Sequence, residues 1–215
     1  MTTTRRDLLK AFLGLGALAG LGAAPRVLRI GNHFPTGDAS WPGALLGFEE
    51  AERTAALLQV KLQWAASADV LAGREAPAKL SVPFLAAGPA LETLARPRVF
   101  RVASSPHFRQ RVMAKRKGLR VVDWHPDLER FGAEQLNERF HRRFGRPMDE
   151  AAWRGWVAVK IAAEAALRGG VLEQLGSAGF DGHKGTQLRF GGDHFLIQPV
   201  YLVDAKGKMV EEVAP

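Results

Sequence analysis

Apolar residues recur every three to four positions in two neighbouring stretches between Trp124 and Gly170. This spacing places them on one face of a helix, so the pattern predicts two amphipathic helices separated by the breaker 144–148. The first helix carries Leu128, Phe131 or Gly132, Leu136, Phe140 and Phe144, and the second carries Ala152, Trp153, Trp156, Val157, Ile161 and Ala165. Asp149 is a favourable N-cap for the second helix, and Gly169-Gly170 ends it. Helices this apolar require a sheet or further helices to cover them.

Short apolar runs bounded by glycine and proline predict strands upstream of these helices. The expected strands cover residues 27–34, 60–64, 82–86 and 99–103, and helices are expected at 42–58 and 90–95. The stretch 65–81 is too short for a full crossover helix and a full strand. Because crossover helices connect parallel strands, this alternation predicts an α/β fold with a mainly parallel sheet and helices on both faces.

The C-terminal part predicts a β-hairpin. Residues 186–190 and 197–203 have strand-like composition, and Gly191-Gly192-Asp193 between them is typical of a tight turn.

The first residues predict an export signal. Arg5-Arg6 precedes the mild, uncharged run AFLGLGALAGLGAA, which is the twin-arginine pattern and is too short for a typical membrane span of about 20 apolar residues. We expect a signal sequence over 1–24, cleaved near Ala23 or Ala24, and a single domain over 25–215 in the periplasm. An uncleaved N-terminal anchor is the alternative.

The composition excludes some classes of function. The chain has no cysteine, which excludes disulfides, zinc–thiolate sites and thiol catalysis. The net charge is +8, and the stretch 96–120 is basic without a single acidic residue. A solvated helix face, an acidic partner, an anionic lipid surface and a nucleic acid could each explain it. The lack of a nucleic-acid-binding motif and the export signal argue against the last, so no nucleic-acid partner is expected.

The sequence carries no nucleophile elbow, phosphate loop or dinucleotide motif, so we predict neither an enzyme nor a cofactor. Two groups of residues have metal-ligating side chains: Glu138 with His141, and Asp181, His183, Asp193 and His194. Helix-surface and turn positions explain both groups better, and no metal is expected.

Five segments together resemble the type I periplasmic binding proteins of the Leu/Ile/Val-binding, ABC-transporter branch. In chain order these segments are 29–51, 81–88, 99–105, the two predicted helices together with residues 124–128 before them, and 180–203. The first segment contains Arg29-Ile-Gly, Pro35-Thr-Gly and Trp41-Pro-Gly. The resemblance covers nearly all of the mature chain. The family has two α/β lobes that close on a ligand, whereas here Ser105–Gly118 runs almost directly into the late segment, so most of the second lobe is expected to be missing.

The resemblance implies a substrate-binding component of an ABC-type transport system, with a small-molecule ligand and a membrane permease as partners. The ligand would be an amino acid, another organic acid or an alcohol-derived metabolite, held in an open cleft. The family's ligand positions map to Trp41, Ser67, Ala87 and Gly88, with Thr36 and Ser40 as further candidates.

The missing lobe also supports a second hypothesis. The chain could be a degenerate, non-transport interaction protein whose exposed former interface binds a protein partner, a second copy as a homo-oligomer, or a lipid-like ligand.

Overall fold

The computed structural model describes residues 26–89, 96–114, 116–185 and 187–215. The expected signal sequence and the expected helix at 90–95 lie outside these ranges. In the described part of the chain, no helix is both long and apolar enough to span a membrane.

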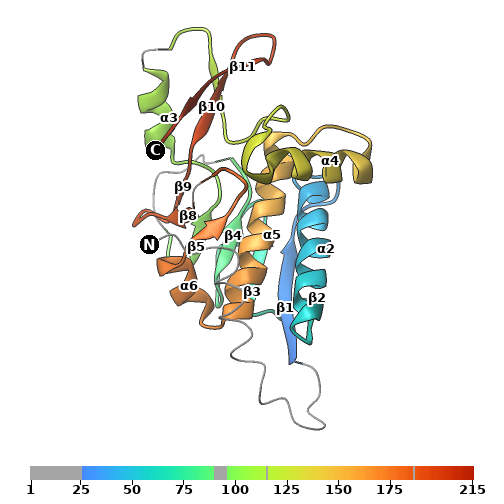
Figure 1. Ribbon diagram of the computed structural model, residues 1–215. Coiled ribbons are helices and arrows are strands. Elements are labelled where there is room, and N and C mark those ends of the chain that lie inside the picture. The colour runs from blue at the N-terminus through green and yellow to red at the C-terminus, as the bar shows by residue number, and fades with distance from the viewer. Residues whose placement is uncertain (1–25, 90–95, 115, 186) are drawn as a thin grey trace, which may run out of the picture.

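The first body is built on a parallel sheet of five strands in the order β2-β1-β3-β4-β5 (Figure 1). The strands are β1 (Arg26–His33), β2 (Val60–Trp64), β3 (Val70–Gly73), β4 (Phe84–Ala86) and β5 (Val99–Arg101). This confirms the predicted α/β fold with a mainly parallel sheet.

Helices α2 (Trp41–Leu57) and α5 (Glu150–Arg168) pack on one face of this sheet and against each other. Asp149 caps α5 as predicted, since its Oδ1 accepts a 2.8 Å hydrogen bond from the Ala152 N–H. Glycine allows the two helices to approach closely: a Cβ on Gly43 would lie 1.7 Å from the Ala152 carbonyl oxygen.

The opposite face of the sheet is covered differently. There Phe84, Ala86 and Val99 form a small separate cluster with Leu71, Ala76 and Leu80, the last two from the chain between β3 and β4. Arg29 and Lys61, which alternate with the buried positions Leu28 and Leu62, are exposed. Both described helices on the sheet therefore lie on a single face, and polar residues replace a second helical layer over β1 and β2.

The short connection between β2 and β3 has a simple explanation. Strand β2 pairs with β1 over Arg26–Ile30, and β3 pairs with the other edge of β1 over Ile30–His33. Strand β3 thus begins at the level along β1 where β2 ends. Residues 65–69 pass directly from one edge of β1 to the other and need not run back to the amino end of the sheet, so no crossover helix is required. Gly31 makes this possible, because a Cβ there would lie 2.2 Å from Leu71 Cδ2 and 3.4 Å from Ala68 Cβ.

The predicted helix over 128–144 is shorter than expected. It is α4 (Ala133–Phe144), preceded by the 3-10 turn η2 (Arg130–Gly132), in which Phe131 has φ 59° and Gly132 has φ 85°. This left-handed backbone cannot continue an α-helix toward Leu128.

The second body contains α3 (Pro106–Met113) and an antiparallel sheet in the order β11-β10-β6. Its strands are β6 (Arg120–Val122), β10 (Val200–Val203) and β11 (Met209–Val213), and it lies beyond the ends of the parallel strands (Figure 1). Between β5 and β6 the described chain forms only helix α3. The second lobe is therefore reduced, as the sequence predicts.

The predicted C-terminal hairpin needs a correction. After α6 (Val171–Ser177), strand β8 (Gln187–Phe190) pairs with β7 (Phe180–Asp181) and with β9 (Leu196–Ile197). The hairpin therefore ends at Ile197, and residues 200–203 belong to the second body, where they pair with β6 and β11. Pro199 lies at this division and has no N–H to continue the ladder.

Candidate functional site

An open hollow lies beyond the carboxyl ends of β1 and β3, the edge at which open parallel sheets bind ligands. Its volume is about 490 Å³, and its lining is His33, Pro35, Thr36, Gly37, Asp38, Arg74 and Glu75. The end of β1 and the loop after it supply the first five of these residues, and the end of β3 supplies the other two.

Asp38 and Arg74 are the charged pair in this hollow. Arg74 Nη1 lies 2.9 Å from Asp38 Oδ2, and the other carboxylate oxygen accepts hydrogen bonds from the Ser40 N–H at 2.8 Å and from the Ser40 hydroxyl. Burial raises the pKa of Asp38, but the bonds from Ser40 and Arg74 outweigh it, so that this pKa lies below its usual value. The Asp38 side chain is only 4% exposed, whereas that of Arg74 is 47% exposed, so the guanidinium is the group that a solute can reach.

Sequence reasoning missed both residues. Asp38 follows Pro35-Thr-Gly and has the composition of an ordinary turn residue. Arg74 follows strand β3, which the sequence did not predict within the short segment 65–81.

The predicted site residues near the start of α2 have different positions. Thr36 is exposed and lines the hollow. Ser40 is buried and its polar atoms bind Asp38. Trp41 does not line the hollow; its ring centroid lies 6.0 Å from that of Phe34 and 6.1 Å from that of Trp64.

The other predicted positions are not part of the lining either. The N–H groups of Ala87 and Gly88 donate to the carbonyl oxygens of Gly73 and Arg74 at 2.8 and 2.9 Å, so these backbone donors already have partners. Ser67 is exposed in the segment that crosses β1. Of the predicted residues, Thr36 thus shares the lining of the hollow with Asp38 and Arg74, and Ser40 holds Asp38 from the buried side.

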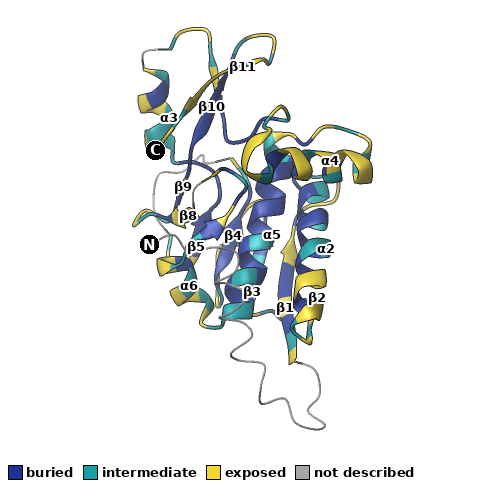
Figure 2. Cartoon of the chain, viewed as in Figure 1, coloured by how far each residue is buried: buried dark blue, intermediate teal, exposed yellow. Residues whose placement is uncertain are grey.

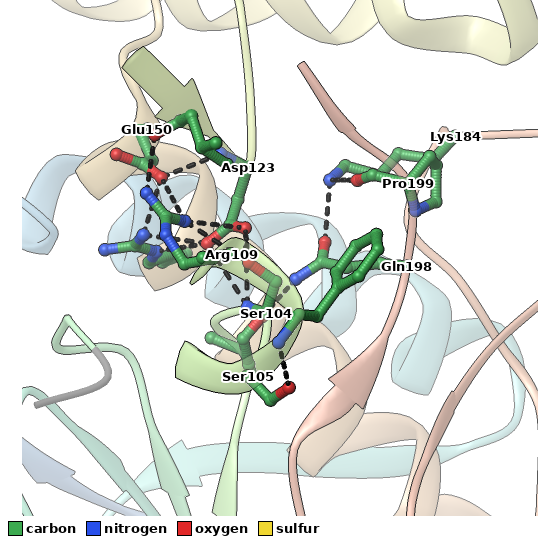
Figure 3. Close-up of polar contacts among 12 residues, drawn as sticks. Ser104, Ser105, Arg109, Asp123, Glu150, Lys184, Gln198 and Pro199 are labelled. Atoms are coloured by element: carbon green, nitrogen blue, oxygen red, sulfur yellow. Dashed lines mark hydrogen bonds and ion pairs between the residues drawn. The ribbon is translucent and has the colours of Figure 1, made fainter. Parts of the chain in front are cut away.

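A buried polar network joins the two bodies (Figure 3). The chain passes between them at three crossing segments, residues 102–105, 122–124 and 198–200. Asp123, which is fully buried, accepts a 2.6 Å bond from Ser104 Oγ and two bonds from Arg154 on α5, at 2.9 Å from Nε and 2.7 Å from Nη2. The first two crossing segments are therefore tied to each other and to the longest helix.

Arg109 and Glu150 complete the charges of this network. Glu150 Oε1 accepts from Arg154 Nη2 at 2.6 Å and from the Asp123 N–H at 2.7 Å, and Arg109 Nη1 lies 3.2 Å from Asp123 Oδ1. Burial raises the pKa of Asp123, but Arg154 and Arg109 reverse this effect and hold the pKa well below its usual value. The carboxylate is therefore ionised in the folded protein.

Lys184 ties in the third crossing segment. Its ammonium donates to Gln198 Oε1 at 2.6 Å and to the Pro199 carbonyl at 3.0 Å, while Gln198 Nε2 donates to the Val102 carbonyl at 2.8 Å (Figure 3). Lys184 Nζ also lies 4.2 Å from the centroid of the Trp153 ring. Burial lowers the pKa of Lys184 to about 7, although Asp123 and Glu150 act in the opposite direction.

Several arginines of the basic stretch 96–120 bind other parts of the chain. Arg96 Nη2 donates to the Pro77 carbonyl at 2.9 Å, and Arg98 Nη1 donates to the Ser81 carbonyl at 2.5 Å. Arg109 belongs to the network above, and Arg116 forms an ion pair with Glu211 at 2.6 Å. Lys117 and Arg120 are exposed, and an external acidic partner for them stays a prediction. Arg111 on α3 is exposed as well, so part of the stretch is a solvated face, while the arginines above bind carbonyls and carboxylates of the chain itself.

Within the described residues, no three histidine, aspartate or glutamate side chains meet in a way that could hold a metal ion. His194 stacks on Phe100 with a centroid distance of 4.6 Å, and the His183 N–H donates to Asp181 Oδ1 at 2.8 Å.

No protein-family model matches the chain, and no curated protein matches its sequence. Solved structures do match. The branched-chain amino acid transporter substrate-binding protein LivJ from Streptococcus pneumoniae, solved with isoleucine, has a TM-score of 0.65 at 11% identity, covering 88% of this chain and 100% of LivJ. An ABC transporter substrate-binding protein from Sphaerobacter thermophilus has a TM-score of 0.62 at 13% identity, covering 88% and 98%.

A periplasmic binding protein from Burkholderia mallei has a TM-score of 0.68 at 9% identity, covering 89% of this chain and 96% of that protein. The structural similarity establishes the fold, but sequence identities this low do not identify the ligand. The chain has the fold of the Leu/Ile/Val-binding type of periplasmic substrate-binding proteins, with a reduced second lobe.

Proposed function

We propose that the protein is a periplasmic, non-enzymatic, substrate-binding-protein-like component of an ABC-type transport system, exported by its twin-arginine-type signal sequence. It would bind a small organic solute in the open hollow and pass it to a membrane permease. The observation that carries this proposal is the half-exposed guanidinium of Arg74 at the carboxyl ends of the parallel strands, in a fold shared with solute-binding proteins.

The chemistry of the hollow favours a solute with a carboxylate. The Arg74 guanidinium lies between two carboxylates of the chain, with Nη1 2.9 Å from Asp38 and Nε 3.6 Å from Glu75. Its exposed edge can still donate a charge-assisted hydrogen bond to the carboxylate of a solute, and Thr36 lies on the same lining. Amino acids and other organic acids fit this arrangement better than an alcohol-derived metabolite without a charge. Trp41, Ser40, Ser67, Ala87 and Gly88 would support the shape of the site.

A thermal-shift screen against amino acids, organic acids and small alcohols tests this proposal. A ligand at about one hundred times its Kd stabilises the folded state by roughly 2.7 kcal/mol. We expect a shift with at least one carboxylate-bearing solute, and we expect Arg74→Ala to remove it. Arg53→Ala, an exposed site on α2, is the matched control and should keep the shift. No shift with any solute would contradict the proposal.

A second function is favoured by the reduced second body, which leaves the hollow open on one side. In this case the protein would be a degenerate interaction protein whose strand-end face binds a protein partner, a second copy or a lipid-like ligand. A melting temperature that rises with protein concentration, without any response to solutes, would support this alternative.

A further inference from the structure

A second cavity, which we name the Tyr201 cavity, lies between the two bodies and shares no lining residue with the hollow. Its volume is about 180 Å³. The lining comes from the segment around η2, the turn 182–185 and strands β10 and β11, and it consists of Asp127, Leu128, Glu129, Arg130, Phe131, His183, Lys184, Tyr201, Met209 and Glu212. Drug-sized ligands occupy roughly 300–1,000 Å³, so this cavity fits a molecule of a few carbon atoms.

Tyr201 gives the cavity a specific polar group. The side chain is buried, with 2% of the residue exposed, and among the described residues its hydroxyl has no hydrogen-bond partner. Among the described residues, the Tyr201 hydroxyl oxygen is not one of the polar side-chain atoms that are fully buried and lack a hydrogen bond. Since it has no partner, it must retain some contact with solvent. Tyr201 is also a lining residue of the cavity, so the cavity is where a ligand could reach this hydroxyl. Buried hydroxyls without a partner are rare in folded proteins, because losing the hydrogen bond costs free energy.

The backbone around the cavity is held in uncommon conformations. Phe131 and His183 both have left-handed φ angles, 59° and 57°, and Gly185 has φ 81°. Gly185 is required here, because a Cβ at this position would lie 2.4 Å from the Phe131 ring. The Phe131 ring packs against this glycine and is 57% exposed as part of the lining. Non-glycine residues in this region of φ cluster at ligand sites, where the fold maintains the strain.

The charged groups of the lining are paired within the chain or exposed to solvent. Asp127, Glu129 and Glu212 place carboxylates on it, and Glu212 lies 3.1 Å from Arg130. The buried amine of Lys184 already bonds Gln198 and Pro199, whereas Asp127 and Glu129 are exposed to solvent. Within the described lining, no buried charge is therefore left to pair with an ion beside Tyr201, and an unpaired ion there would lose its water at a high cost in free energy. The apolar part of the surface comes from Leu128, Phe131 and Met209.

We propose that the Tyr201 cavity is a second ligand site, which binds a small uncharged molecule with a short hydrocarbon body and one amide, carbonyl or hydroxyl oxygen. The oxygen accepts a hydrogen bond from the Tyr201 hydroxyl, and the hydrocarbon body lies against Phe131, Leu128 and Met209. The site is independent of the hollow, so it stands whether or not the hollow binds a solute.

Four probes of similar size test the proposal: butyramide, 1-butanol, butanoate and butylammonium. Each is titrated into the ¹⁵N-labelled protein, and amide chemical shifts are followed. We expect the two neutral probes to shift the amide signals of Phe131, Lys184 and Tyr201, and the two ions to bind more weakly. Equal or stronger binding of either ion at these residues, or no shift there with either neutral probe, would overturn the proposal.

Tyr201→Phe removes only the hydroxyl, which has no partner to lose within the described chain. Loss of one neutral hydrogen bond should weaken butyramide binding about fivefold. Phe131→Ala, at an exposed position, should also weaken it, and this variant provides the test if Tyr201→Phe folds poorly. Thr36→Ala changes the hollow alone and should leave butyramide binding unchanged. Unchanged affinity in Tyr201→Phe, or a loss in Thr36→Ala, would show that the probe binds elsewhere.

Discussion

Lys184 is the residue whose environment differs most from that of a typical lysine. The ammonium group is almost fully buried, and two oxygens of one crossing segment accept its hydrogen bonds. Burial lowers its pKa to about 7, so the folded protein releases this proton far below the ordinary lysine value of 10.5. The unfolded chain keeps its proton up to that ordinary value. Between these two pH values the unfolded state therefore binds more protons than the folded state.

This difference predicts how stability depends on pH. Stability rises with pH wherever the unfolded state binds more protons, so the Lys184 contribution should increase from about pH 7 to pH 10. We expect the free energy of unfolding of the parent protein, minus that of Lys184→Met, to grow across this window. Urea unfolding at about pH 6.5, 8 and 9.5 measures it. Lys206→Met, at an exposed turn position, should give a constant difference, and a constant difference for Lys184→Met would contradict the prediction.

Among the elements, the pair α2 and α5 depends on glycine for its close contact. A Cβ on Gly43 would lie within 3 Å of three backbone atoms of Ala152, and one on Gly155 would lie 2.0 Å from the Ser40 carbonyl oxygen. Backbone atoms in two packed helices cannot move aside as a flexible side chain can. The spacing of these helices is therefore set by the missing side chains.

We expect Gly43→Ala to lower the free energy of unfolding by about 3 kcal/mol, the upper part of the usual range for overpacking. Gly176→Ala on α6 is the matched control. No atom lies within 4 Å of the position that a Cβ would take at Gly176, so the change should be neutral or stabilising by up to about 1 kcal/mol, because alanine favours helix. Thermal and urea unfolding measure both variants. Similar stability of Gly43→Ala and the parent would mean that the helices can separate at little cost.

For the molecule as a whole, the polar network around Asp123 connects the parts. Ser104, Asp123 and Gln198 lie on the three crossing segments, and Arg154 joins them to α5. Figure 2 shows that the chain is buried where the bodies meet, whereas the outer turn of the second body is exposed. A hydrogen-bonded network in this position favours one arrangement of the two bodies.

Asp123→Asn should lower the free energy of unfolding by about 3–5 kcal/mol, because it leaves the buried guanidinium of Arg154 without its main counter-charge. Since the pKa of Asp123 is lowered from 3.8 to about 2 in the folded protein, its stabilising effect should be fully present above the ordinary aspartate value and lost as the pH falls through about 2. Urea unfolding at about pH 7 and pH 2.5 checks both statements. Asp127→Asn, with a side chain that is 75% exposed, should change stability by less than about 0.5 kcal/mol. Equal effects of the two variants would contradict the role of the network.

Local signals in the sequence determined α5, the α/β fold class and most strands. Asp149 caps α5 and Gly169 ends it within a few residues, and the apolar spacing between them needs no distant partner to be recognised. The reduction of the second lobe was also predictable, because it follows from the short chain between Ser105 and Val121 and from the resemblance to a two-lobed family. Such features depend on residues that are close in the chain.

Only the tertiary structure decided the features that join distant segments. Strand β3 is recognisable only once residues 65–69 cross β1 over Gly31, and the end of the hairpin at Ile197 depends on β10 pairing with β6. Arg74 meets Asp38, and Arg109 and Arg154 meet Asp123, across separations of 14 to 36 residues. The sequence identifies these side chains as charged, but the partner of each charge is set by the packing of the elements, since electrostatic and hydrogen-bonding contacts depend on distance in space.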